Sequence, residues 1–453
     1  MHRRPNKRFR KLGDGIIYEL DSVKEATFNL QREKKSRAAM ATKRLQDTTG
    51  SVDPAASAKR PRESDGGPST IPALQPLPAD LLLEVAARMD VMTVLRCAAT
   101  SKPLRRAILD PGFRRLLDLR AASGGFGPAL LLGFSYRVTN KKTKLFRSHV
   151  VENASPRPRP RLRIDEPSLL ESLEPVASRD GLLVLRRDGG GPTVCDTLTG
   201  DVTSLPPTGM SVYYPPAVLA VGGGSDRSFE LLVVDRDLRI QTLLSKNGRW
   251  GAVRAVTRPA KLGSPAPAHP AVVGRAVHWL CLGARPRWPR DPEHYHVLAV
   301  DVDAAEATKV RLPPRYSGRM FATARDGYLR LVTVGGRLSL VVAESFAVSV
   351  WTLTSAPAWS RHVVISTVEL VRRTGLPPAD PPRSFCPMRL LGFGERSGVV
   401  VLEMRPRELV YLNLGTKAVT VARHASQFES GCITHVCLHE VGLASLLQDM
   451  KYF

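Results

Sequence analysis

The residues best suited to chemistry lie near the end of the chain. Cys432, His435, Cys437 and His439 are all types that bind zinc. On a strand, His435, Cys437 and His439 would share one face, because alternate side chains point the same way. Structural zinc sites, however, usually take paired ligands from two separate elements. We therefore interpret this segment as a closing strand with partly exposed histidines, and we expect no metal site.

Motifs for other kinds of catalysis are missing. The sequence has no Gly-x-Ser-x-Gly elbow, no phosphate loop ending in Gly-Lys-Ser/Thr and no His-Glu-x-x-His helix. His294 and His296 would also share a strand face, and we assign them a structural role. We expect no catalytic residue and no cofactor, so the chain is predicted not to be an enzyme. The alternative is an enzyme whose site is assembled from residues far apart in sequence.

One basic loop has the composition of a binding surface. Arg285, Arg287, Trp288 and Arg290 alternate with prolines between two apolar segments. Arg and Trp are favoured anchors at protein interfaces, and recognition is usually built on loops. These four residues are candidates for binding a target protein, although a Trp packed against its own domain is the plainer interpretation.

The elements around these candidates are mostly short strands. From about residue 176, apolar segments of strand length recur between Gly, Asp and Pro, in groups of three or four over about 40–50 residues. One such group cannot cover its own apolar faces, whereas stacked groups can. This pattern predicts a β-propeller of about six blades. A pair of β-sandwiches is the alternative.

A different pattern precedes the strands, from Leu77 to Leu117. Pro78 suits the first turn of a helix, and Leu82, Val85 and Met89 fall on one apolar face. Ser101 can cap a later helix. The spacing predicts three short helices. About forty residues of helix bury little core alone, which favours a docking module over a self-sufficient domain.

These helices resemble an F-box. The resemblance is carried by Leu77-Pro78-x-Asp80-Leu81-Leu82-x-Glu84-Val85 and by Leu95-Arg96-Cys97-Ala98-Ala99-Thr100-Ser101-Lys102-x-Leu104-Arg105. It covers about one tenth of the chain, and it implies binding to the Skp-type adaptor of a cullin–RING ubiquitin ligase. The implied adaptor-binding residues are Leu77, Pro78, Leu81, Leu82, Val85, Leu95 and Leu104. The family usually has Trp at the position of Leu104, a change expected to lower adaptor affinity more than it alters the fold.

The strand groups resemble the C-terminal associated domain of plant F-box proteins, whose blades are kelch-like. The matching segments are Ser178-Arg179-Asp180-Gly181, Val194-Cys195-Asp196-x-Leu198-Thr199-Gly200, Leu205-Pro206-Pro207 and Val277-His278-Trp279-Leu280. They describe turns and packing. The chain is thus expected to contain a disordered basic region at 1–75, an all-α F-box unit at 76–120 and an all-β propeller-like domain at 121–453.

Charge and cysteine usage set the remaining expectations. The 453 residues carry 66 Lys and Arg against 42 Asp and Glu, a net charge of +24, with basic segments at 3–11, 34–44 and 59–62. Such a balance favours contact with nucleic acid, acidic proteins or anionic surfaces. We interpret the basic N-terminal segments as a solvated tail with no dedicated partner, with nuclear import and nonspecific phosphate binding as the alternatives, and we do not expect nucleic acid as a partner. The six cysteines are dispersed, which indicates reduced thiols in the nucleus or cytoplasm. No apolar run of 18 residues occurs, so no membrane span is expected.

Together these features predict a substrate-recognition adaptor of an SCF-type ligase. Its expected partners are the Skp-type adaptor and a target protein that the sequence does not name, in the nucleus or the cytoplasm. The alternative is a nuclear protein- or nucleic-acid-binding scaffold with no role in ubiquitin ligation. A strong salt dependence of binding that is lost on deleting residues 1–62 would favour that alternative.

Overall fold

The structure is a computed structural model. It describes residues 79–89, 91–113, 115–117, 129–139, 146–152, 162–164, 167–187, 190–222, 227–257, 259, 263–266, 268–282, 295–313, 327–344, 346–354, 358–375, 388–405, 408–421 and 432–449. The predicted basic region 1–75 lies outside these residues. So do Arg285, Arg287, Trp288 and Arg290, the predicted target-binding residues.

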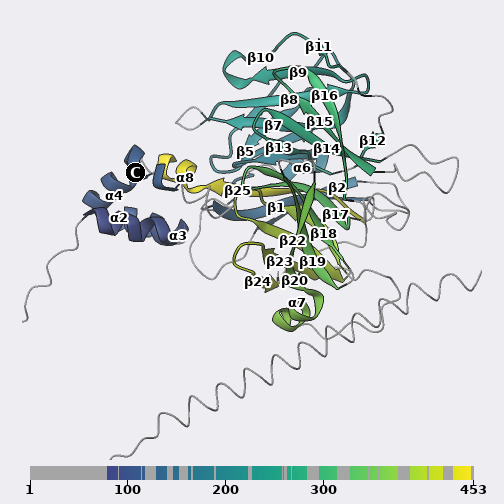
Figure 1. The fold of residues 1–453 in the computed structure, drawn as a ribbon. Helices are drawn as coiled ribbons and strands as arrows, with labels where there is room; N and C mark the ends of the chain where they lie inside the picture. The colour runs from purple at the N-terminus through teal and green to yellow at the C-terminus, as the bar shows by residue number, and fades with distance from the viewer. Residues whose placement is uncertain are drawn as a thin grey trace, which may run out of the picture. The chain divides into compact units, whose positions relative to one another are not determined.

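Three short helices open the described chain (Figure 1). They are α2 (Ala79–Arg88), α3 (Val91–Thr100) and α4 (Lys102–Leu109). The predicted cap is present on α4, where the Ser101 hydroxyl accepts a hydrogen bond from the Leu104 backbone N–H at 3.5 Å. Pro103 lies in the first turn, where its missing N–H leaves no bond unmade. Residues 111–113 and 115–117 are again helical.

The core of this helical unit includes residues from the other end of the chain. Its buried members from the helical segments are Ala86, Ala87, Val91, Val94, Ala98, Ile108, Phe113 and Leu117. Leu443, Leu446 and Leu447 of the C-terminal helix α8 (Leu443–Asp449) belong to the same apolar cluster. Because so small a unit buries little apolar surface alone, α8 supplies part of the core that the three helices lack.

Five sheets of four or five strands form most of the described β region, and neighbouring strands in each sheet run antiparallel. The first contains β3 (Glu174–Arg179), β4 (Leu182–Arg186), β5 (Thr193–Asp196) and β6 (Val202–Ser204). The second contains β7 (Val212–Val221), β8 (Phe229–Asp235), β9 (Arg239–Leu244), β10 (Arg249–Trp250) and β11 (Arg254–Ala255).

The third contains β12 (Ser264–Pro265), β13 (Ala271–Val273), β14 (Ala276–Leu282), β15 (Tyr295–Asp301) and β16 (Glu306–Arg311). The fourth contains β17 (Leu329–Val334), β18 (Arg337–Ala343), β19 (Ala347–Leu353) and β20 (Trp359–Ser366). The fifth contains β21 (Arg389–Phe393), β22 (Val399–Arg405), β23 (Glu408–Asn413) and β24 (Val419–Val421). Short helices α6 (Pro167–Ser172), η1 (Ser245–Asn247) and α7 (Thr367–Thr374) lie in the connections.

A three-stranded sheet joins the two ends of the β region. β1 (Ala129–Thr139) lies between β2 (Phe146–Glu152) and β25 (Cys432–Gly442). β25 contacts β3 and β21, and further contacts link β3 to β7, β7 to β14, β13 to β17 and β17 to β21. The described strands therefore form a five-bladed propeller whose ring is closed by the β2–β1–β25 sheet (Figure 1).

The predicted count of six blades is wrong, and the prediction of a propeller is confirmed. The strands that would have made a sixth blade come from both ends of the region. They form a sheet of three strands in place of a four-stranded blade.

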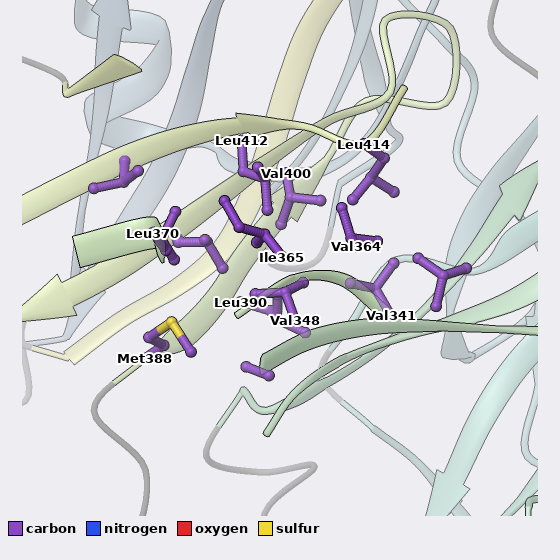
Figure 2. Packing of buried hydrophobic residues seen from close by; sticks show 14 of the residues in the cluster. Val341, Val348, Val364, Ile365, Leu370, Met388, Leu390, Val400, Leu412 and Leu414 are labelled. Carbon is purple, nitrogen blue, oxygen red and sulfur yellow. The ribbon is translucent and has the colours of Figure 1, made fainter. Parts of the chain in front are cut away.

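Apolar side chains hold neighbouring blades together, as the fourth and fifth blades show (Figure 2). Val341 of β18, Leu390 of β21 and Val400 of β22 lie in one buried cluster with Leu370 of α7. Both faces of an inner strand are covered in this way, which is why the strands read as nearly continuous apolar segments. Among the helices that the structure describes, none has the length and apolar character needed to span a bilayer.

Candidate docking face and central cavity

Helix α2 has an apolar face that no other described element covers. Leu81, Leu82 and Val85 are 48%, 38% and 49% exposed, whereas Ala86 and Ala87 are each 3% exposed. Residues at i, i+1 and i+4 lie on one side of a helix. Contiguous exposed apolar side chains mark interaction sites more often than scattered ones do. We call Leu81, Leu82 and Val85 the α2 face.

The other predicted adaptor-binding residues fall into two groups. Leu77 and Pro78 lie outside the described residues. Leu95 and Leu104 are partly buried and pack against the core of the helical unit. Within the described helices of this unit, the α2 face is therefore the apolar surface open to a partner.

A cavity lies where inner strands of the ring meet. This cavity has a volume of about 230 Å³, and its wall comes from β3 and the turn after it, the segment before β13, β17, the β21–β22 turn and β25. Its charged wall residues are Arg179, Asp180, Arg330, Glu395, Arg396 and Glu440. Ligand sites are commonly concave spaces, for example in the mouths of β-barrels, where a few polar groups converge.

The last two residues of β3 connect neighbouring parts of the ring through their side chains. The Ser178 hydroxyl donates to the Leu438 carbonyl of β25 at 2.8 Å. Arg179 donates from Nη1 to the carbonyls of Val218 and Leu219 on β7, both at 2.8 Å. The first blade is thus bonded to the closing sheet on one side and to the second blade on the other.

Asp180 extends these contacts to the start of α8. Its carboxylate accepts hydrogen bonds from the Gly442 backbone N–H at 3.0 Å, the Ser445 hydroxyl at 3.2 Å and the Arg396 guanidinium at 3.3 Å. Its backbone has φ +47°, and Gly181 follows with φ +82°. Sequence reasoning identified this segment as a turn, and missed that its side chains line the cavity.

The other two carboxylates on the wall also have partners. Glu395 Oε2 forms an ion pair with Arg179 Nε at 3.6 Å. Glu440 accepts from the backbone N–H groups of Ser397 at 3.0 Å and Arg396 at 3.2 Å. Burial raises the pKa of both carboxyl groups, and these partners oppose the shift. Each wall carboxylate is thus paired with a cation or with N–H donors of the protein itself.

Arg330 differs from the other charged wall residues. It lies on β17, and its Nη2 donates to the Leu391 carbonyl of β21. Burial lowers the pKa of Arg330 to about 10. The guanidinium is still charged at neutral pH, and the structure shows no ion pair between it and another described residue.

The prediction that this segment is a closing strand is confirmed by β25. The side chains of Cys437 and His439, however, are buried. Cys437 is 0% exposed, its Sγ lies 3.4 Å from His269 Nε2, and burial raises its pKa to about 12. The thiol therefore stays protonated at neutral pH, unlike an activated nucleophile. His439 is 1% exposed, so the prediction that this histidine is partly exposed is wrong. Burial lowers the pKa of His439 to about 3.

Metal binding finds no support in the described part of the chain. No group of three or more His, Cys, Asp or Glu side chains there is arranged to hold a metal ion. The side chains of Cys432 and His435 lie outside the described set.

Comparison with known families divides the chain at the same place as the change from helices to strands. Residues 74–116 match the F-box domain family. Residues 133–453 match a family described as "Domain of unknown function (DUF7595)". The chain belongs to the DUF7595 family. Its DUF7595 region contains the five blades, most of β1, the other two strands of the closing sheet, α8 and the whole cavity wall, and it follows an F-box domain. No curated protein matches the chain.

Solved structures resemble the DUF7595 protein only distantly. The N-terminal domain of Nup159 is 14% identical, with 55% of this chain and 64% of that chain covered and a TM-score of 0.29. PorZ of the Porphyromonas gingivalis type-IX secretion system is 11% identical, with 68% and 34% covered and a TM-score of 0.31. Oligogalacturonate lyase from Vibrio parahaemolyticus is 9% identical, with 65% and 86% covered and a TM-score of 0.31. The chain spans less than two thirds of the first two, and scores this low say nothing about function.

Proposed function

We propose that this protein is a substrate-recognition adaptor of an SCF-type cullin–RING ubiquitin ligase. The F-box domain binds the Skp-type adaptor, and the propeller holds a target protein. The observation that carries the proposal is the exposed apolar α2 face within an F-box domain that precedes a propeller. F-box domains generally bind Skp-type adaptors, and an exposed apolar helix face is the kind of surface that such binding buries.

The proposed mechanism is one of proximity. Other subunits of the ligase carry the ubiquitin chemistry, and this chain raises the effective concentration of lysines on its target. The chain itself acts as a binding protein without catalysis, in the nucleus or the cytoplasm. The resemblance of its strand groups to the associated domain of plant F-box proteins supports this assignment.

The test is capture of a purified Skp-type adaptor by the full chain. We expect wild type to recover the adaptor and Leu81→Asp with Val85→Asp to recover none. Burying two carboxylates in an apolar interface costs several kcal/mol beyond the lost apolar contact. Since both side chains are about half exposed, the substitutions should leave the fold unchanged.

A matched control places the same charges on the blades. Val202 and Val253 are 44% and 45% exposed, so Val202→Asp with Val253→Asp adds equal charge at similar exposure away from the F-box. This variant should bind the adaptor like wild type. Adaptor recovery by the α2 variant, or none by wild type, would show that the F-box is not the docking element.

A further inference from the structure

The cavity wall carries a cation, Arg330, that pairs with no opposite charge among the residues the structure describes. Arg330 lines the cavity, and its recorded hydrogen bond goes to the Leu391 carbonyl. A guanidinium has five N–H donors and cannot release its proton at neutral pH. None of the Arg330 side-chain nitrogens is both fully buried and without a hydrogen-bond partner. The Arg330 donors that make no hydrogen bond are therefore accessible from the cavity.

The nearby acids do not supply that counter-charge. Asp180 is paired with Arg396, and Glu395 with Arg179. Glu440 accepts from two backbone N–H groups of the β21–β22 turn and from the Ser397 hydroxyl. Cys437 interacts electrostatically with Arg330, but burial raises the pKa of its thiol to about 12 and so keeps it neutral.

Holding a charged guanidinium in this position costs free energy unless a ligand of opposite charge pairs with it. Removing a charge from water is compensated only when a partner of opposite charge and matching geometry is present. A carboxylate suits a guanidinium, because the two planar groups can form parallel hydrogen bonds.

We propose that the cavity receives an acidic side chain of the target protein, Asp or Glu, whose carboxylate pairs with Arg330. This inference rests on the proposed function and names the chemistry that the target must present. A volume of about 230 Å³ lies below the roughly 300–1,000 Å³ of sites for drug-sized molecules. It therefore accommodates one side chain of a peptide segment, while the rest of the segment lies outside.

The wall favours a carboxylate over a phosphate. A phosphorylated residue carries about −1.5 to −2 charge at neutral pH and is usually held by several arginines. In this cavity Arg179 and Arg396 are already engaged by Glu395 and Asp180. A dianion would also approach three carboxylates, whereas a single negative charge balances Arg330, the wall residue that forms no ion pair within the described part of the chain.

Blocked pentapeptides of sequence acetyl-Gly-Ala-X-Ala-Gly-amide provide the probe, with X as Glu, Gln or phosphoserine. Each is titrated calorimetrically into the full chain. We expect the Glu peptide to bind wild type about tenfold more tightly than the Gln peptide, the difference typical of one charge-assisted pair. Arg330→Gln should remove that preference. Arg330→Lys should keep part of it, because the positive charge remains while the paired donors of the planar guanidinium are lost.

Arg337→Gln is the matched control. Arg337 is exposed on β18, the strand paired with β17, and does not line the cavity, so its loss should leave the Glu preference intact. Equal binding of the Glu and Gln peptides, or no binding of the Glu peptide at concentrations on the order of 10 mM, would overturn the proposal. Tighter binding of the phosphoserine peptide would also overturn it, in favour of a phosphate site.

These results are separable from the test of adaptor binding. Arg330→Gln should still capture the Skp-type adaptor, because Arg330 lies in the DUF7595 region and outside the F-box. If adaptor capture fails while the Glu peptide still binds, the ligase assignment is wrong and the acidic-peptide site stands. If the wild-type chain shows no preference for the Glu peptide over the Gln peptide, the proposed acidic-peptide site is refuted, whether or not Arg330→Gln folds.

Discussion

Replacing Asp180 with alanine should loosen the junction between the propeller ring and α8. The carboxylate is 6% exposed and has three donors. They are the Gly442 N–H at 3.0 Å, the Ser445 hydroxyl at 3.2 Å and the Arg396 guanidinium at 3.3 Å. Its φ of +47° lies in the left-handed region, which Asp adopts more readily than Ala.

Several contributions set the expected loss of stability. Leaving the Gly442 N–H without an acceptor costs about 1–3 kcal/mol. The pair with Arg396 contributes at most about 1 kcal/mol, because that guanidinium is 46% exposed and water screens the charge. The Ser445 hydrogen bond and the left-handed backbone add about 1–2 kcal/mol together. The free energy of unfolding should fall by about 4 kcal/mol in total.

The assay combines urea denaturation with hydrogen exchange followed by mass spectrometry. Exchange should accelerate most in the segment 436–449, where the Gly442 amide and α8 lose their anchor. Asp180→Asn is the matched control, since its amide oxygen still accepts a hydrogen bond and Asn tolerates the left-handed conformation. It should lose only about 1 kcal/mol. An alanine variant as stable as the asparagine variant, with exchange in 436–449 unchanged, would refute this account of the junction.

Two further substitutions test the C-terminal segment. Leu447 is 0% exposed in the core of the helical unit, so Leu447→Ala should lower the free energy of unfolding by about 2–5 kcal/mol. Proteolysis within residues 79–117 should accelerate in this variant, whereas Ser445→Ala should have a much smaller effect. For His439, the folded pKa of about 3 lies below the unfolded value of 6.5, so the unfolded state binds a proton first as pH falls. Its contribution is fully present above pH 6.5 and is lost between pH 6.5 and about 3, by about 2 kcal/mol at pH 5. His439→Leu should therefore show a weaker loss of stability in that window by urea denaturation; an identical pH profile would contradict the burial of a neutral ring.

Local patterns were enough to predict the first three helices and the strand groups, but not helices α6, α7 and α8 within the region predicted to be all-β. The Ser101 cap and the spacing of apolar residues placed the three helices, since both are interactions between residues close in sequence. The recurring strand groups predicted a propeller for a similar reason: each blade is one continuous segment of chain. The blade count failed because β1 and β25 pair across almost the whole β region, Thr139 with Cys432 for example, and no local pattern records such a pairing.

The cavity could not be predicted from the sequence, for a related reason. Arg330 alternates with Leu329 and Leu331 in a strand, a pattern that predicts one apolar face and one solvated face. In a propeller the polar face of an inner strand can border the space inside the ring, so the same alternation places a charge on a cavity wall. The Asp180 turn was recognised by its residue types, yet its partners on β25 and α8 lie about 260 residues away.

The C-terminal segment connects the two proposed activities of the chain. β25 closes the ring and supplies Glu440 to the cavity wall, and α8 follows it directly with leucines in the core of the F-box helices. Asp180 bonds to the first residues of this connection while also lining the cavity. A ligase adaptor must hold its target at a defined place relative to the docking helix, because the gain in effective concentration is lost when the geometry varies. Contacts from one segment to both sites serve that requirement better than a flexible linker would.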